Sequence, residues 1–473
     1  MRITPPYHFI RHLPPEPFRK YDIRGDTSIL TADVVYTLGQ CIAARMHTLD
    51  ESKIIVGRDA RLSSPALSQA LKCGLLDGGI DVIDLGIVTS PMVYFATNTL
   101  NTQCGIALTA SHNPKHHNGL KIVLQGKSLT TEDLQALKQS ACAANFNANR
   151  QGTLENHDIA PAYIEKITQV VQLKKPMKIA LDCGNGAASD IAPRVFKALG
   201  CEIIPLYCSF DGNFPNHHPD PSTPENLRDL QMAVDTHKTD AGLAFDGDAD
   251  RLGVVSNMGR IIWPDQQMML FAQGVLKQHP GCPIVFDVKC SDHLSKVIEA
   301  AGGTPIMWKT GHSLIKAHMR SCQAPLAGEM SGHIFFSDPW FGFDDGIYAG
   351  VKLLDYLQQS AHNDLDSMLD SLPKSHSTPE IKLPCADHEK AVVMQRLANA
   401  LPPQAIVNDI DGLRLSFMNG WWLIRASNTT PHLTTRCEGN SPSSLLALQS
   451  QLIEWLNQVC PNLDTSPLKQ QLH

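Results

Sequence analysis

The sequence predicts an α/β protein made of three similar units with mixed, mostly parallel sheets, followed by a smaller C-terminal α+β domain. Three observations lead to this fold class. The chain has 473 residues, which the usual domain size divides into three or four domains. One order of apolar strands and helices returns three times, and it stops in the last hundred residues. Because strands that alternate with helices pair in parallel and gather ligands beyond their carboxyl ends, we expect the units to surround a central cleft.

The first unit follows a proline-rich lead-in and the segment KYDIRG at residues 20–25. Its expected elements are a helix over 31–46 with an N-cap at Thr31, a strand over 53–59, a helix over 66–76, and strands over 81–85 and 106–108. The last strand ends in a loop that carries Thr109, Ser111, His112 and Asn113 and is broken by Pro114. The unit therefore places a hydroxyl at a strand end.

The second and third units repeat this order. In the second we expect strands over 178–182, 202–206 and 242–245, and helices over 191–199 and 227–234. In the third we expect strands over 283–287 and 304–307, and helices over 293–301 and 314–319, before a last strand. The third strand of the second unit leads into Asp246, and that of the third unit leads into Glu329. Each unit thus presents one polar loop.

The last hundred residues have a different pattern. Residues 372–384 are rich in proline and are expected to form a linker. Strands over 412–417 and 421–425 bracket Asn419-Gly420, which is typical of a hairpin turn, and a closing helix covers 444–459. We therefore expect four domains, over residues 1–155, 156–257, 258–371 and 372–473, the last being a lid that binds phosphate.

The composition bounds the partners and the location of the protein. A net charge of −7 and a pI near 6.3 argue against nucleic-acid binding, so local Arg and Lys must meet any anionic ligand. Thirteen scattered cysteines without a C-x-x-C pair indicate neither disulfides nor a structural zinc site, and they fit the reduced cytoplasm. The N-terminus lacks the apolar core of a signal peptide, and no apolar run is long enough for a membrane span. We expect a cytoplasmic protein without membrane or nucleic-acid partners.

The second unit's loop carries three aspartates at alternate positions, Asp246, Asp248 and Asp250. Carboxylates crowded in this way need a positive partner, for which a hard divalent cation is the obvious candidate. The alternative is a solvated acidic turn. A calcium EF-hand is excluded, because Arg251 and Asn257 stand where that loop needs Gly and Glu. A few carboxylates together with a phosphate oxygen are typical of a Mg2+ site.

The other polar loops suit a sugar phosphate. Glu329, Ser331 and His333 offer donors and acceptors for adjacent pyranose hydroxyls. A guanidinium with small polar donors can grip a phosphate dianion, and the fourth domain offers Arg425, Ser427, Asn428 and Thr429. Considered one at a time, each of these loops, like the Ser-His-Asn-Pro run at Ser111, could equally be an ordinary turn.

Together these loops resemble the α-D-phosphohexomutases, most closely their bacterial phosphomannomutase/phosphoglucomutase branch. The resemblance runs from KYDIRG at 20–25 to RASNTTP at 425–431 and so covers nearly the whole chain. It implies that Ser111 carries phosphate, that Ser111 and the three aspartates bind Mg2+, and that Arg251 lies close to the phosphoserine. It also implies a hexose 1,6-bisphosphate as intermediate and activator, and a monomer or weak dimer.

The resemblance assigns further residues. Arg24, His112, Lys121 and His312 match polar positions around the reacting phosphate, although no single one of them is nominated as the base. Tyr21, Lys289 and His312 are expected to contact substrate. Met330 in GEMSGH matches the mannose/glucose branch, whereas phosphoglucosamine mutases usually have Gln there. Thr430 stands where many members have Glu. The pairs His116-His117 and His217-His218 show no partnered ligand set and are expected to be surface residues.

The expected reaction is the reversible transfer of phosphate between O1 and O6 of mannose or glucose phosphates. Three other functions remain open at this point. A phosphoglucosamine mutase would use the same loops, and a metal-dependent sugar phosphatase would use the serine and the metal. A non-catalytic regulator would bind sugar phosphate without needing either. Glucose 1-phosphate isomerisation, measured against release of free phosphate, separates the mutases from the phosphatase and the regulator.

Overall fold

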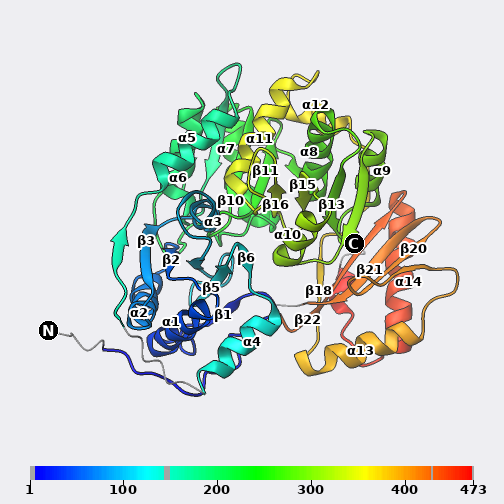
Figure 1. The fold of residues 1–473 in the computed structure, drawn as a ribbon. Coiled ribbons are helices and arrows are strands. Elements are labelled where there is room, and N and C mark those ends of the chain that lie inside the picture. Colours follow the sequence, from blue (N-terminus) through cyan, green and yellow to red (C-terminus); the bar gives the residue numbers. More distant parts are fainter. Residues whose placement is uncertain (1–5, 143–149, 428–429, 471–473) are drawn as a thin grey trace.

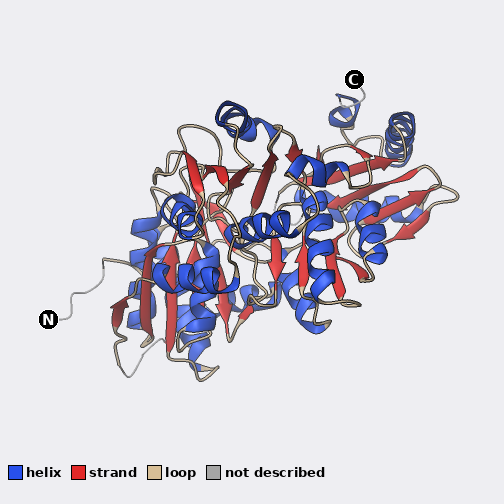
Figure 2. Ribbon diagram, turned by 90° about the horizontal axis from the view of Figure 1, so that it is seen from above, coloured by secondary structure: helices blue, strands red, loops and turns tan. Residues whose placement is uncertain are grey.

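The computed structural model describes residues 6–142, 150–427 and 430–470, and it confirms the predicted fold class. Three α/β units follow one another along the chain, and a smaller domain completes it (Figure 1). In the α/β units, helices lie on both sides of the strands (Figure 2). Within the described residues, no helix is both long and apolar enough to cross a bilayer.

The first unit is built on a sheet with the strand order β1-β5-β4-β2-β3-β7, and β6 pairs with β5. Its elements are β1 (Ile23–Asp26), α1 (Ala32–His47), β2 (Lys53–Arg58), α2 (Ser64–Asp77), β3 (Asp81–Ile87), α3 (Ser90–Thr99), β4 (Gly105–Leu108), β5 (His117–Leu124), β6 (Lys127–Ser128), α4 (Thr131–Ser140) and β7 (Leu154–Asn156). Thr31 caps α1 as predicted, since its hydroxyl accepts from the Val34 amide. The sequence did not predict β1, which places Arg24 in a strand, or α3, β5, β6, α4 and β7.

The second unit repeats this arrangement in the order β12-β11-β10-β8-β9. It comprises α5 (Ala160–Val170), β8 (Lys178–Asp182), α6 (Ala188–Ala198), β9 (Glu202–Leu206), the 3-10 turn η1 (Pro224–Leu227), α7 (Arg228–His237), β10 (Ala241–Phe245), β11 (Leu252–Ser256) and β12 (Ile261–Ile262). The predicted strands and helices of this unit are all present.

The third unit has the order β14-β13-β15-β16. It comprises α8 (Pro264–Gln278), β13 (Pro283–Asp287), α9 (Asp292–Ala300), β14 (Thr304–Trp308), α10 (His312–Ser321), β15 (Leu326–Gly328), β16 (Ile334–Phe336), α11 (Gly346–Gln359) and α12 (Leu365–Asp370).

The repeat extends to strand pairing. In each unit one parallel strand, β2, β8 or β13, lies between the other two. The third strand, β4, β10 or β15, then turns back through a polar loop into an antiparallel neighbour. The predicted repeat is therefore confirmed, and each polar loop lies at the carboxyl end of an equivalent strand.

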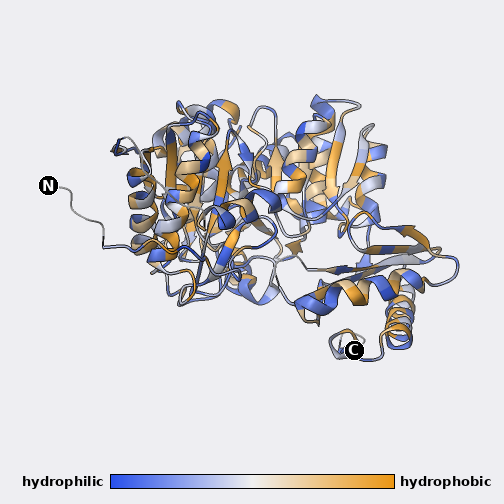
Figure 3. Cartoon of the chain, turned by 60° about the horizontal axis from the view of Figure 1, so that its bottom comes forward, coloured by the Kyte–Doolittle hydropathy of each residue, from blue (hydrophilic) through white to orange (hydrophobic). Residues whose placement is uncertain are grey.

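One apolar core runs through all three units. It joins Ile55 of β2 to Ile179 of β8 and Ile284 of β13, and Trp340 stacks on Tyr348 within it, with ring centroids 4.2 Å apart. Figure 3 shows the strands largely at the hydrophobic end of the scale, while many helix turns are hydrophilic. A shared core holds the three polar loops in fixed relative positions.

The fourth domain has a mainly antiparallel sheet with the order β17-β22-β21-β20-β19, and β18 also pairs with β22. Its elements are β17 (His376–Ser377), β18 (Ile381–Pro384), α13 (Asp387–Asn399), β19 (Ile406–Asn408), β20 (Leu413–Phe417), β21 (Gly420–Ala426), β22 (His432–Gly439), α14 (Pro442–Val459) and α15 (Ser466–Lys469). The expected hairpin is confirmed, but Phe417 pairs with Gly420, so Met418 and Asn419 form the turn.

The segment 372–384 is not a free linker. Leu372 is buried in the core of the α/β units, and β17 and β18 belong to the fourth sheet. Prolines at the edge of this sheet are compatible with strand structure, because an edge strand can lack a ladder donor. The connection between the third and fourth domains is therefore shorter than the proline content indicated.

The fourth domain packs tightly against the third unit. Arg414 donates to the Cys290 carbonyl at 2.9 Å and to the Val288 carbonyl, and its guanidinium lies 3.5 Å from the centre of the Trp421 ring. Arg436 of β22 donates to Asp265 of α8 in the third unit at 3.0 Å. Any opening of this domain relative to the third unit must break these buried contacts.

Candidate active site

The polar loops of the four domains line one cleft of about 660 Å³. The sequence-predicted residues on its wall are Tyr21, Arg24, Ser111, His112, Lys121, Arg251, Lys289, His312, Glu329, Met330, Ser331, His333, Arg425, Ser427 and Thr430. Residues 428 and 429, which include the predicted ligands Asn428 and Thr429, lie outside the described residues. The three aspartates of the second unit are buried behind the wall, where Asp246 contacts Ser111.

Ser111 is held in a strained, buried position directly after β4. Its φ of 51° is in the left-handed region, which is uncommon for a residue with a Cβ and is concentrated at functional sites. Its Oγ donates to Asp246 Oδ2 at 2.5 Å and lies 3.1 Å from His112 Nδ1. Gly247 permits this approach, because a Cβ there would lie 2.4 Å from the Ser111 carbonyl oxygen. The first and second units thus meet at the serine hydroxyl.

The three aspartates form a buried cluster after β10. One carboxylate oxygen from each lies within 4.8 Å of the others. Burial raises the pKa of Asp246 well above its usual range, and the neighbouring Asp250 and Asp248 raise it further. Asp248 Oδ1 is buried without a hydrogen-bond partner among the described residues. A buried orphan oxygen and crowded carboxylates next to Ser111 fit a divalent cation.

Lys121 already neutralises part of this charge. Its Nζ donates to Asp248 Oδ2 at 2.6 Å and to Asp250 Oδ2. Burial opposes charge on the ammonium group, but the two carboxylates outweigh this effect and raise the pKa of Lys121 well above its usual value. With a cation between Asp248 and Asp250, Asp246 is the carboxylate that contacts Ser111, and Asp248 Oδ1 stays without a hydrogen-bond partner among the described residues.

Arg251 and His333 connect the acidic loop to the third unit. Arg251 Nε lies 3.9 Å from Asp246 Oδ2, close to Ser111 as expected, and 3.3 Å from His333 Nε2. His333 Nε2 lies 3.4 Å from Asp250 Oδ1. Burial opposes charge on His333, but Asp250 and Glu329 outweigh it and raise its pKa to about 9. The carboxylates beside the ring thus favour its protonated form, against burial and the neighbouring Arg251.

The loop after β15, which carries Glu329 to His333, is ordered by its own side chains. Glu329 accepts from the Gly311 amide at 2.5 Å and lies 3.0 Å from His333 Nδ1, while the Ser331 hydroxyl is 2.8 Å from the same nitrogen. Met330 accepts a hydrogen bond at sulfur from Arg436 of the fourth domain, at 3.2 Å. The loop is thus a preformed set of donors and acceptors.

The fourth domain contributes Arg425 and Ser427 at the end of β21. Arg425 Nε donates to Asp411 at 3.1 Å, and Ser427 Oγ lies 2.8 Å from Thr430 Oγ1. Lys390 of α13 donates to the carbonyls of Ser427 and Thr430 at 2.8 and 2.6 Å, which fixes both ends of the loop. A guanidinium and hydroxyls on a braced loop can bind a phosphate.

The remaining predicted residues also lie around the cleft. Arg24 donates to Asp22 at 2.6 Å and to Asn113 Oδ1 at 3.1 Å, so it is already anchored. Lys289 donates to Glu380 at 2.9 Å. Burial lowers the pKa of both His112 and His312 well below the usual histidine value, and neighbouring cations lower it further. These two rings are neutral, the form in which an imidazole can accept a proton.

Sequence reasoning missed a buried arginine that holds the serine loop. Arg61 donates to the carbonyls of Ser111 at 2.7 Å, Asn113 at 2.6 Å, Pro114 at 2.6 Å and His117 at 3.1 Å. Asp59 in turn accepts from the Thr109 hydroxyl at 2.7 Å and lies 3.2 Å from Arg61 Nε. The only local signal was the polar end of a predicted strand, GRDAR, which carries no information about the loop it meets.

The expectation that the two histidine pairs lack partners was wrong, although His116 and His218 are exposed as expected. His217 is half-buried and its Nε2 lies 2.9 Å from Asp182, and His218 contacts the His112 carbonyl. His116 and His117 lie next to Asp26 of β1. The partners come from distant parts of the chain, which is why no partnered set is visible in the sequence. Ser90 was also missed, and its hydroxyl donates to Asp248 at 2.5 Å.

Comparison with known proteins agrees with this geometry. Four domain families match the chain in order: phosphoglucomutase/phosphomannomutase alpha/beta/alpha domain I over residues 15–148, domain II over 161–259, domain III over 263–376, and the C-terminal domain over 380–454. Together they span most of the sequence.

Individual relatives are similar over nearly their whole length. The chain is 47% identical over 437 residues to the phosphomannomutase/phosphoglucomutase of Pseudomonas aeruginosa, covering 92% of this chain and 94% of the relative. It is 46% identical over 439 residues to the phosphoglucomutase of Neisseria gonorrhoeae, covering 92% and 95%. A crystal structure of a phosphoglucomutase/phosphomannomutase family protein from Burkholderia thailandensis matches with a TM-score of 0.90 and 43% identity, over 95% of this chain and 98% of that one. The chain therefore belongs to the phosphoglucomutase/phosphomannomutase family, in the bacterial branch of the α-D-phosphohexomutase superfamily.

Proposed function

We propose that this protein is a phosphohexomutase that interconverts the 1-phosphates and 6-phosphates of mannose and glucose. The observation that carries the proposal is one cleft that has a nucleophile on one side and a phosphate-binding arginine on another. Ser111 Oγ lies 2.5 Å from a buried aspartate of the acidic cluster, and Arg425 lines the same cleft from the fourth domain. A hexose with phosphates at its two ends needs both.

The reaction runs in two balanced steps. The phosphate on Ser111 passes to the free hydroxyl of a hexose monophosphate, so that the bond to Oγ breaks, a bond to the sugar oxygen forms, and the hydroxyl proton moves to a base. From the base that proton passes to the departing Oγ. The resulting 1,6-bisphosphate turns over in the cleft, and its other phosphate returns to Oγ as the bond to its sugar oxygen breaks and the Oγ proton passes to that oxygen. The neutral His112 and His312 are candidates for the base, and Lys121 and Arg24 are the cationic candidates around the phosphate.

Asp246, Asp248 and Asp250 would hold Mg2+ together with the phosphate on Ser111. When bound, the ion polarises the phosphoryl group and neutralises charge that develops on its oxygens. The cationic side chains Arg251 and Lys121 balance the cluster, while Glu329, Ser331 and His333 bind sugar hydroxyls. Tyr21, Lys289, Arg425, Ser427, Asn428 and Thr429 bind the sugar phosphate, with hexose 1,6-bisphosphate serving as activator.

The finer parts of the proposal concern specificity and setting. Met330 favours mannose and glucose over amino sugars, because its thioether offers no amide to the sugar and is engaged by Arg436. The first three domains are proposed to end at residues 155, 257 and 371. The fourth domain acts as a lid, and the protein is a monomer or weak dimer. All thirteen cysteines are free thiols, which is consistent with a cytoplasmic location.

Two measurements test the function. The purified protein is assayed for conversion of glucose 1-phosphate to glucose 6-phosphate and for release of free phosphate, and Ser111 is mapped for phosphate after incubation with a hexose 1,6-bisphosphate. A mutase isomerises without release and carries the phosphate on Ser111. Net phosphate release would identify a phosphatase, binding without either reaction would identify a regulator, and full turnover by Ser111→Ala would remove the assigned nucleophile.

A panel of sugar 1-phosphates tests the specificity separately. We expect turnover of glucose and mannose 1-phosphates well above that of glucosamine and N-acetylglucosamine 1-phosphates. A preference for the glucosamine compound would identify a phosphoglucosamine mutase instead. Met330→Gln is the matched variant, and a rise in its relative activity on glucosamine phosphate would assign the discrimination to this position.

A further inference from the structure

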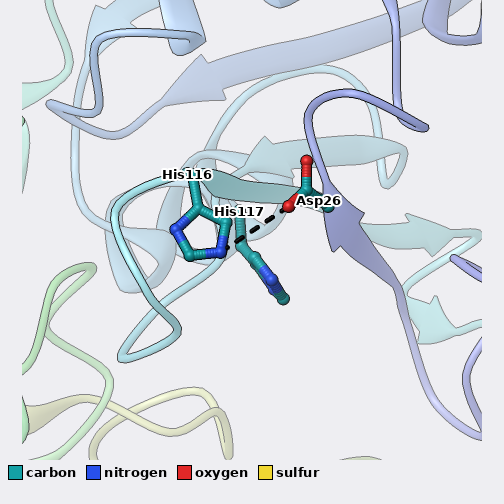
Figure 4. A group of neighbouring side chains, drawn as sticks. All are labelled: Asp26, His116 and His117. Carbon is teal, nitrogen blue, oxygen red and sulfur yellow. Dashed lines mark ion pairs between the residues drawn. The ribbon is translucent and has the colours of Figure 1, made fainter.

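A second group of metal-ligating side chains lies where β1 ends and β5 begins. Asp26 and His117 are paired across these two strands, and His116 precedes His117 (Figure 4). One ring nitrogen of each histidine and one Asp26 carboxylate oxygen all lie within 4.8 Å of one another. None of the three lines the cleft. This cluster, which we call the β1–β5 cluster, is therefore separate from the acidic triad.

The geometry of the β1–β5 cluster approaches that of a metal site. His116 Nε2 lies 3.6 Å from Asp26 Oδ2, and two ligands about 2.0–2.1 Å from a tetrahedral ion are about 3.4 Å apart. The Ser28 amide donates to Asp26 Oδ1 at 2.8 Å, which orients the carboxylate and leaves Oδ2 toward His116. Figure 4 shows the two rings and the carboxylate gathered at the strand ends, with His116 facing Asp26.

The chemistry of the donors selects the ion. Two imidazoles and one carboxylate are typical ligands of Zn2+ and its transition-metal neighbours, whereas Mg2+ prefers oxygen. The side chains of His116 and Asp26 are 59% and 39% exposed, so an ion can enter from solvent and water can complete its coordination. We propose that the β1–β5 cluster binds a divalent transition metal ion of the Zn2+ class, independently of the catalytic Mg2+ site.

The same cluster is linked to the serine loop. His117 Nδ1 lies 3.2 Å from the Asn113 amide nitrogen, and Asn113 Oδ1 accepts from Arg24, which lines the cleft. A metal on Nδ1 displaces the Asn113 amide, and a metal on Nε2 leaves Nδ1 protonated and unable to accept. In either case Asn113 loses this hydrogen bond. Occupancy of the cluster therefore releases Asn113 and weakens the anchor of Arg24, so the bound ion lowers turnover.

Binding is tested first, because it does not depend on the proposed function. The full-length protein is saturated with Mg2+ and titrated with Zn2+ against a competing chelator, and Cu2+ is used as a paramagnetic probe. We expect one high-affinity equivalent and Cu2+ spectra with two nitrogen ligands. His116→Gln and Asp26→Asn are each expected to weaken Zn2+ binding at least about 10-fold. Asp248→Asn, which disturbs the triad, should leave this binding in place.

The matched control is His388→Gln, an exposed histidine beside Asp387 on α13. It is expected to bind Zn2+ as the wild type does. If wild-type protein binds no Zn2+ in Mg2+, if His116→Gln binds it unchanged, or if Asp248→Asn abolishes it, the cluster is not a metal site.

The effect on turnover rests on the proposed function and is measured separately. Zn2+ added with excess Mg2+ is expected to lower kcat for glucose 1-phosphate at least about 3-fold, and His116→Gln should remove this inhibition without changing activity in Mg2+ alone. Inhibition that persists in His116→Gln would overturn the link to the loop. Failure of the function itself would appear as an inactive wild type that still binds Zn2+ at the cluster.

Discussion

The guanidinium of Arg61 donates a 2.7 Å hydrogen bond to the backbone oxygen of Ser111, the residue with the strained φ of 51°. Three further carbonyls of the same loop accept from this side chain. Arg61 is fully buried, and its charge is balanced by Asp59 at 3.2 Å. A single planar cation thus fixes the conformation of the loop that carries Ser111, the proposed nucleophile.

Replacement of this cation should damage both folding and turnover. Arg61→Met leaves Asp59 and four carbonyls without their partner, so we expect a loss of about 3–5 kcal/mol in the stability of the first domain. Arg61→Lys keeps the charge but loses the planar guanidinium that donates to several carbonyls at once. The kcat should therefore fall at least about 10-fold, with little change in KM. Denaturant unfolding and steady-state kinetics measure the two effects. Arg150→Ala, which breaks an exposed ion pair with Asp81, should change stability by less than about 1 kcal/mol.

The acidic triad should be needed for turnover more than for substrate affinity. Removing divalent metal with a chelator should abolish activity, and Asp248→Asn should lower kcat by about 100-fold or more, because the metal stabilises charge mainly in the transition state. Asp235→Asn is the control, since its exposed pair with Lys238 lies on the surface of the same unit. Undiminished activity in the chelator would contradict the metal assignment.

Arg425 should contribute equally to the binding of mannose and glucose phosphates. Arg425→Ala removes a charged hydrogen-bonding fork, which costs about 2–3 kcal/mol and corresponds to a rise in KM of about 30- to 150-fold for mannose and glucose phosphates. More bisphosphate intermediate should also escape into solution, and it can be measured by its ability to activate a second mutase. Arg396→Ala, an exposed arginine of the same domain, should behave as wild type. A normal KM with no escaped bisphosphate would place phosphate binding elsewhere.

Asp345 should make the folded protein less stable as the pH rises. Burial raises the pKa of this carboxyl to about 7, although it caps α11 by accepting from the Tyr348 amide at 2.9 Å. The folded state therefore binds a proton more tightly than the unfolded state. The contribution of this tighter proton binding to the free energy of unfolding is fully present below about pH 4. It is lost as the pH rises through about 7, by up to about 4 kcal/mol.

Asp345→Asn isolates this contribution, because Asn can also cap a helix and accept from Tyr348. Thermal midpoints between about pH 5 and 8 should fall more steeply for the wild type than for this variant. Asp364 caps α12 in the same manner, but hydrogen bonds from the Ser367 amide and hydroxyl lower its pKa. Asp364→Asn should leave the slope over this range unchanged. Equal slopes for Asp345→Asn and wild type would show that Asp345 is ionised throughout.

Local sequence was sufficient for the repeated strands and for the loops that follow them. A short apolar run such as Ile106 to Leu108, ended by polar residues and a proline, predicts a strand that leads into a loop wherever it occurs. Three such runs in one order predicted equivalent positions for Ser111, Asp246 and Glu329. Other elements were missed, among them α11, which is buried from Gly346 to Leu357 although Lys352 and Asp355 lie within it.

Only the tertiary structure decided which side chains meet. Arg61 reaches Ser111 because β2 lies beside β4, and Lys121 enters the acidic triad because β5 returns along β4 toward the second unit. The contact of His116 with Asp26 likewise depends on the pairing of β5 with β1. Sequence spacing fixes the face and the end of a strand, which are local properties of the backbone. The partner of a side chain depends on sheet order and on the packing of separate domains, and these are set by long-range burial that no local pattern records.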